Sequence, residues 1–278
     1  SSLHITRRER IGLMVIVGLA LYGVKVLHSP IRFTFHDEFL HWRTAADILL
    51  SGRLFSENTI LTVSPLYPGL EIVTTAFANL SGLEIFPSAL ITLGAARVIL
   101  MIALYLFFEQ VARSPHVGSI AALLYMGNSN FLYFDAQFSY ETLSLPIATA
   151  VLYAVALRER SQDRSLFRLA LLILPMILMI AITHHLTAYV LAGLLFVWAF
   201  VAYFVNRAQR EWLDVGIIAA LTLAAVTGWT FLTGSTTETY LGPVFRGGAS
   251  EFVRLLFSTE SGRLLFRGAA GQAAHSWE

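Results

Sequence analysis

The amino-acid sequence predicts an all-α protein that crosses a membrane several times. Of its 278 residues, 56% are hydrophobic and only 13% are charged, whereas a soluble domain carries roughly 25% charged residues. Several windows are almost free of charge, namely residues 11–27, 88–108, 169–183, 186–205 and 215–233. A membrane-spanning helix needs about 20 apolar residues, so these windows, extended into their flanks, predict spanning helices.

The arginine residues gather in a few short segments, which predicts the direction of each helix. These segments carry Arg7, Arg8 and Arg10, then Arg113, then Arg158, Arg160, Arg164 and Arg168, and finally Arg207 and Arg210. If all four segments are cytoplasmic, about seven spans follow. They are residues 11–27, 88–111, 117–133, 140–157, 167–183, 186–205 and 213–233.

This topology predicts one membrane module over residues 1–234, with residues 29–87 as its first external loop. Residues 235–278 are then an external loop or the start of a further C-terminal region. Because the chain begins with Ser and stops at Glu278 within loop-like sequence, we expect it to be part of a longer protein.

The first external loop is expected to hold two helices that lie on the membrane surface. Residues 69–83 form an apolar stripe and a polar stripe at helical spacing. If this segment crossed the membrane, the later arginine loops would lie on the external side, so we expect it to lie on the membrane surface. Residues 38–50 are also two-faced, with Phe39 and Trp42 on one side and His41 on the other. Asp37 and His41 are one turn apart, so they can cooperate.

Polar residues are predicted to collect on the bilayer face opposite the arginine loops. Side chains of this kind near a membrane usually face a cavity or one another, which predicts a shared pocket. The groups are His36, Asp37, Glu38, His41 and Arg43; Ser64, Tyr67 and Glu71; Asp135, Gln137, Tyr140 and Glu141; and His184, His185 and Thr187. Arg97 lies within a predicted span and needs a partner.

Several of these residues also have ordinary structural explanations. Asp37 lies three residues after Thr34, which is the spacing of a capping box. Glu141 suits the first turn of a helix because of the helix dipole, and Arg43 can pair with Asp47 on the surface of one helix.

Composition narrows the chemistry that such a pocket can perform. The chain has no Cys and a net charge of +1, which argues against thiolate catalysis, Cys-ligated metals and nucleic acid as a partner. A carboxylate at the water–lipid boundary can take a proton from an acceptor hydroxyl, and His or Arg can hold a phosphate leaving group. The sequence indicates no certain cofactor; carboxylates can hold a divalent cation, so metal use is open.

The sequence resembles the GT-C class of membrane glycosyltransferases, including the protein mannosyltransferases and the aminoarabinose transferases. The resemblance covers roughly residues 11–234. It lies in the acid pair Asp37-Glu38 after the first helix, the turn Ser64-Pro-Leu-Tyr-Pro-Gly-Leu-Glu71, Ala95-Ala-Arg97 and the turn from Phe134 to Glu141. Where the aminoarabinose transferases carry a Lys-Pro-Pro turn, this chain has Ser64-Pro-Leu-Tyr-Pro.

The resemblance implies a transferase that takes sugar from a polyprenyl-phosphate donor at the outer face of the plasma membrane. Its acceptor would be a glycan, lipid or protein, and Asp37 would be the catalytic base, with Glu38 as the second choice. A polysaccharide polymerase or ligase is an alternative, because residues 235–278 carry Arg246, Arg254, Arg263 and Arg267. A transporter or flippase of lipid-linked sugars is another, although no internal repeat is found.

Overall fold

The computed structural model describes residues 5–158, 166–205 and 211–234, with residues 242, 246–248 and 250. Every regular element in this described part is helical. The helices are α1 (Arg7–His28), α2 (His36–Ser51), η1 (Ser64–Leu66), α3 (Gly69–Ser81), α4 (Ile85–Ala112), α5 (Pro115–Met126), α6 (Ser129–Tyr133), η2 (Phe134–Ala136), α7 (Tyr140–Arg158), α8 (Leu166–Thr183), α9 (His185–Val205) and α10 (Glu211–Leu232). The chain divides into Ser1–Gly234 and Ser235–Glu278, and the first unit is described below.

Five of the described helices are long and apolar enough to cross a membrane: α1, α4, α7, α9 and α10. The predicted class, an all-α polytopic membrane protein, is therefore confirmed. The other two expected spans are shorter apolar helices, at Pro115–Met126 and Arg168–Thr183.

The single helix predicted over residues 117–133 is wrong. The helix α5 ends at Met126, and α6 begins two residues after Gly127. The reason is local, because the side chain of Asn128 accepts a hydrogen bond from the backbone N–H of Asn130 and caps a new helix at this point.

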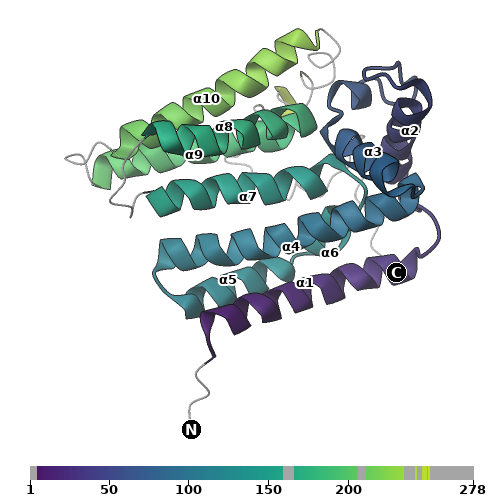
Figure 1. Cartoon of the computed structure of the whole chain (residues 1–278). Helices are drawn as coiled ribbons and strands as arrows, with labels where there is room; N and C mark the ends of the chain where they lie inside the picture. Colours follow the sequence, from purple (N-terminus) through teal and green to yellow (C-terminus); the bar gives the residue numbers. More distant parts are fainter. Residues whose placement is uncertain are drawn as a thin grey trace. The chain divides into compact units, whose positions relative to one another are not determined.

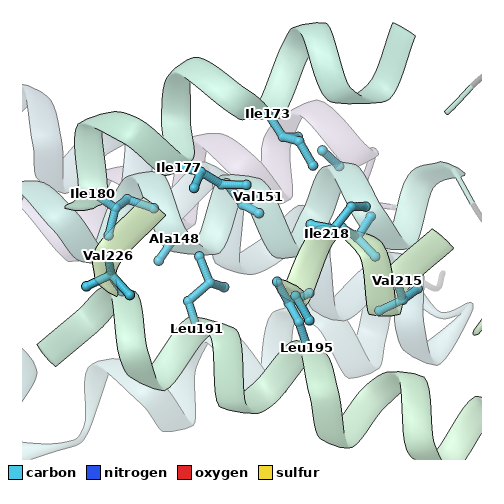
Figure 2. Close-up of a cluster of buried hydrophobic side chains, with 14 of the residues drawn as sticks. Ala148, Val151, Ile173, Ile177, Ile180, Leu191, Leu195, Val215, Ile218 and Val226 are labelled. Atoms are coloured by element: carbon cyan, nitrogen blue, oxygen red, sulfur yellow. The ribbon is translucent and has the colours of Figure 1, made fainter. Parts of the chain in front are cut away.

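The long helices lie side by side, while α2 and α3 lie at one end of the bundle, against α4 (Figure 1). The largest core joins α7, α8, α9 and α10 through aliphatic side chains such as Val151, Ile177, Leu191 and Ile218 (Figure 2). These residues are almost fully buried, so this half of the bundle is held by apolar packing.

The end of the bundle away from α2 and α3 is called the arginine end, because the loop arginines that the structure describes lie there, namely Arg7, Arg8, Arg10, Arg113, Arg158 and Arg168. Here Arg7 pairs with Glu109 at 2.8 Å, which joins α1 to α4. Arg158 pairs with Asp214 at 2.6 Å, which joins α7 to α10. Four of the predicted loop arginines, Arg160, Arg164, Arg207 and Arg210, lie outside the described residues.

The two helices expected in residues 29–87 are present as α2 and α3, but their polar faces are turned inward. In α2, Glu38, His41 and Thr44 are buried while Phe39 and Trp42 are exposed. In α3, Glu71 is fully buried, and Leu80, expected in its apolar stripe, is 88% exposed. Both helices thus bury several polar side chains and expose some apolar ones, while Leu40 and Leu70 are buried as apolar core residues.

Candidate functional site

The candidate site is built around a buried ion pair between α2 and α3. Glu71, in the first turn of α3, is fully buried, and His41 of α2 is 3% exposed. Nδ1 of His41 lies 2.7 Å from Oε1 of Glu71. Because an ionised carboxylate only accepts, Nδ1 of His41 is the donor.

Aromatic rings connect this pair to α7 and to the junction of α8 and α9. Tyr140 lies edge-on to His41, with ring centroids 4.0 Å apart, and stacks on His184 at 5.5 Å. The rings of His184 and His185 are 5.4 Å apart. Together His41, Glu71, Tyr140, His184 and His185 form what we call the histidine cluster.

His184 links the histidine cluster to a partly exposed carboxylate. Its Nε2 lies 3.5 Å from Oε1 of Glu141, whose side chain is 40% exposed, and its Nδ1 lies 2.8 Å from the hydroxyl of Thr187. Burial lowers the pKa of His184, the charge of Glu141 opposes this, and the charge of His41 lowers it further. His184 therefore tends toward the neutral form, in which one ring nitrogen can accept a hydrogen bond.

The turn from Ser64 to Tyr67 closes one side of the cluster. The hydroxyl of Tyr140 donates to the backbone carbonyl of Ser64 at 3.2 Å, and the ring of Tyr67 lies 4.7 Å from that of His185. The indole N–H of Trp229 in α10 donates to the carbonyl of Leu66 at 3.0 Å. The turn is thus held between α7 and α10, with Tyr67 fully buried.

Asp37, the predicted base, lies at the exposed start of α2. Its side chain is 56% exposed and its nearest ionic partner is the exposed His36, at 3.6 Å. The expected partnership of Asp37 with His41 does not form, because His41 bonds to Glu71. Asp37 still lies one helical turn before His41 in α2.

Glu38, the second predicted catalytic acid, is placed as a structural group. It is fully buried and pairs with Lys25 of α1. Its Oε2 accepts from the backbone N–H groups of Thr34 and Phe35 at 3.1 and 3.2 Å, and its Oε1 accepts from that of Phe138 at 3.2 Å. Glu38 therefore caps α2, and the capping role considered for Asp37 is wrong.

Arg97, Asp135 and Gln137 form a separate buried group. The guanidinium of Arg97 donates to the carbonyls of Phe131 and Asp135 at 2.5 and 3.1 Å and lies 3.4 Å from the centre of the Phe131 ring. The carboxylate of Asp135 accepts from the hydroxyl of Tyr125 at 3.3 Å. Gln137 is buried. This group is not part of the histidine cluster, but it holds the segment before α7, which leads directly to Tyr140 and Glu141.

The remaining predicted residue, Arg43, points away from the site. It is exposed and pairs with Asp47 at 3.0 Å within α2, as the simpler explanation predicted. Lys25 was the residue that sequence reasoning missed. It is the only lysine in the chain, and its position at the end of an apolar helix was the available signal.

The histidine cluster and its two neighbours were all predicted as site residues, namely His41, Glu71, Tyr140, His184 and His185, with Tyr67 and Glu141 beside them. Among the described residues, no three His, Asp or Glu side chains are grouped so as to hold a metal ion. No family model, curated protein or solved structure compared with the chain matches it. The resemblance to GT-C transferases is therefore a prediction from the sequence alone.

Proposed function

We propose that this membrane protein is a glycosyltransferase that moves a sugar from a polyprenyl-phosphate donor to an acceptor hydroxyl. The observation that carries the proposal is the meeting of His41, Glu71, Tyr140 and His184, which come from four separate parts of the chain. They meet at the end of the bundle that also exposes Asp37. Ionisable groups placed together at the end of a membrane bundle indicate a functional site.

The proposed reaction is a displacement at the anomeric carbon. Asp37 takes the proton of the acceptor hydroxyl, whose oxygen then bonds to the anomeric carbon. The bond from that carbon to the phosphate oxygen breaks, and its electron pair leaves with the polyprenyl phosphate. The donors of the histidine cluster stabilise the negative charge of the leaving phosphate. Arg43 is not assigned this role, because Asp47 holds it away from the cluster.

The membrane setting suits a lipid-linked donor. The exposed apolar side chains of α2, Phe39 and Trp42, lie on the outer side of the same helix that buries His41. Aromatic residues of this kind favour the boundary between lipid and water. A donor in the bilayer would therefore reach the cluster by lateral diffusion. From the positive-inside rule we propose that this end faces the extracytoplasmic side of the plasma membrane.

The test is a transfer assay on the full chain, reconstituted in vesicles with radiolabelled polyprenyl-phosphate sugars and lipid, glycan or peptide acceptors. Asp37→Asn is expected to lower kcat by roughly 10²–10⁴-fold, the usual contribution of a general base. Because Asp37 is exposed, its replacement is expected to leave folding intact.

Glu57→Gln is the matched control, since Glu57 is an exposed carboxylate of the same segment. It is expected to retain full activity. Near-normal transfer by Asp37→Asn would remove Asp37 as the base, and absence of transfer by the native chain with every donor would overturn the proposed function.

A further inference from the structure

We infer that His41 and Glu71 form a catalytic dyad, in which His41 donates a proton to the leaving phosphate oxygen and Glu71 positions His41. This inference rests on the proposed glycosyl transfer and adds the acid that complements Asp37. It is carried by the geometry of the pair and by the environment of Glu71.

The hydrogen bond to Glu71 decides which nitrogen of His41 can react. Since Nδ1 donates to Oε1 of Glu71 at 2.7 Å, Nδ1 is occupied and Nε2 is the nitrogen that can exchange a proton. No described residue forms a hydrogen bond with Nε2 of His41. A buried carboxylate that fixes one ring nitrogen in this way orients the other toward its substrate.

The burial of Glu71 requires a positive partner. A buried carboxylate without a counter-charge is strongly destabilising, and the side chain in the described part of the chain that contacts Glu71 and can carry a positive charge is His41. The second oxygen, Oε2 of Glu71, is buried without a hydrogen-bond partner among the described residues. His41 is therefore the side chain placed to compensate the charge of Glu71, and in its protonated form the imidazole is an acid.

A proton donor beside the leaving oxygen neutralises the negative charge that develops there as the bond breaks. Breaking the bond between the anomeric carbon and the phosphate oxygen leaves a phosphate monoester, whose second pKa is about 6. The proton on Nε2 of His41 passes to that oxygen, while the acceptor proton passes to Asp37. Solvent then returns a proton to His41 and removes one from Asp37, so that the reaction is balanced.

A purely structural role for the pair, holding α2 against α3, makes different predictions. His41→Gln replaces the imidazole by an amide that can still donate to Glu71 but cannot supply an acidic proton. Glu71→Gln keeps an acceptor for Nδ1 of His41 and removes only the charge. Both variants preserve the contact between the helices and alter the chemistry.

The experiment measures kcat against pH for the native chain and both variants in the same vesicles. The native chain is expected to lose kcat as pH rises, because deprotonated His41 is no longer an acid. His41→Gln is expected to lower kcat by roughly 10²-fold and to abolish this alkaline decline. Glu71→Gln is expected to move the decline in kcat to lower pH. Thermal unfolding of each purified variant is measured alongside, to show that the variant is folded.

Each outcome decides between the two roles. An alkaline decline that persists in His41→Gln, or a Glu71→Gln profile that coincides with the native one, would overturn the dyad. If a variant fails to fold, the native profile still decides, since no alkaline decline in kcat would also overturn it. Absence of transfer by the native chain would reject the proposed function and the dyad together, whereas transfer with an unchanged variant profile rejects only the dyad.

Discussion

Two adjacent carboxylates, Asp37 and Glu38, have opposite environments at the start of α2. Both oxygens of Glu38 are used by Lys25 and by three backbone N–H groups, so no lone pair is well placed to take a proton from a substrate. Asp37 meets only the exposed His36 and is open to solvent. A general base needs an accessible lone pair, which makes Asp37 the better candidate of the two.

Breaking the pair of Lys25 and Glu38 is expected to destabilise the protein strongly. Lys25→Met leaves the charge of Glu38 buried without compensation, and such a loss costs about 3–5 kcal/mol. The double variant Lys25→Met with Glu38→Gln removes both charges and keeps one amide oxygen as the acceptor for the backbone N–H groups of Thr34 and Phe35. It is expected to recover most of the lost stability. Thermal unfolding in detergent measures both, and equal melting temperatures for the two variants would contradict the expectation.

Asp135 is expected to make the stability of the segment before α7 depend on pH. Burial raises the pKa of Asp135 from 3.8 to about 6, against the charge of Arg97. The folded chain thus holds this proton up to about pH 6, and the unfolded chain releases it near 3.8. Between these values the folded state binds more protons, so stability falls as pH rises through this window.

The penalty above pH 6 is on the order of 3 kcal/mol. Asp135→Asn is neutral throughout and is expected to lose this dependence. Unfolding of the native chain and the variant by denaturant at pH 4.5 and pH 7 measures the difference. If the two proteins showed parallel pH dependence, Asp135 would not be the responsible group.

At the residue scale, the sequence predicted the membership of the site better than its contacts. The topology derived from the arginine segments predicted that His41, Glu71, Tyr140 and His184 lie at one end of the bundle. The structure brings them together at that end. The partners of Arg97 could not be predicted, because they are backbone carbonyls, which leave no mark on a sequence. Likewise, the sequence does not show which of the adjacent carboxylates, Asp37 or Glu38, is buried.

At the scale of helices, the spacing of apolar residues predicted where most helices lie. It did not predict which faces of α2 and α3 are buried in the protein. In water a polar face is exposed, but beside lipid the rule can reverse, because apolar side chains face the bilayer. The exposure of Trp42 and the burial of Glu71 follow this reversed pattern. Hydrophobic periodicity shows which residues of a helix share an apolar face, but it does not show whether that face packs against the protein or against lipid.

The close approach of α3 to α8 gives a prediction at this scale. A Cβ atom at Gly69 would lie 2.0 Å from the hydroxyl oxygen of Thr183 and 2.9 Å from its Cα atom, so Gly69→Ala forces the two helices apart. Since Glu71 lies two residues further along α3, His41 would lose its partner geometry. We expect a melting temperature lower by several degrees and a loss of transfer activity.

Gly193→Ala in α9 is the control, because a Cβ atom there meets no atom within 4 Å. It is expected to be neutral or stabilising by about 0.5–1 kcal/mol, since alanine favours a helix over glycine. If both substitutions had the same effect on melting temperature, the contact between Gly69 and Thr183 would not limit the approach of α3.

At the scale of the membrane unit, the protein has two chemically different ends. The arginine end is tied by surface ion pairs such as Arg7 with Glu109, whereas the end with α2 and α3 buries its charges as Lys25 with Glu38 and His41 with Glu71. Buried pairs cost desolvation energy that apolar residues would avoid. The pair of Lys25 and Glu38 has a structural role in capping α2, whereas the pair of His41 and Glu71 is the one for which we propose a catalytic role.

The orientation of these two ends in the membrane can be tested with single cysteines, because the native chain has none. Glu57, in the segment between α2 and η1, and His116, in the first turn of α5, are both exposed and lie in segments joining opposite ends of the spanning helices. If the arginine end is cytoplasmic, cysteine at position 57 reacts with an impermeant maleimide added to intact cells. Cysteine at position 116 then reacts only after the membrane is permeabilised. The reverse pattern would place the histidine cluster on the cytoplasmic side, and the donor would then have to be sought in the inner leaflet.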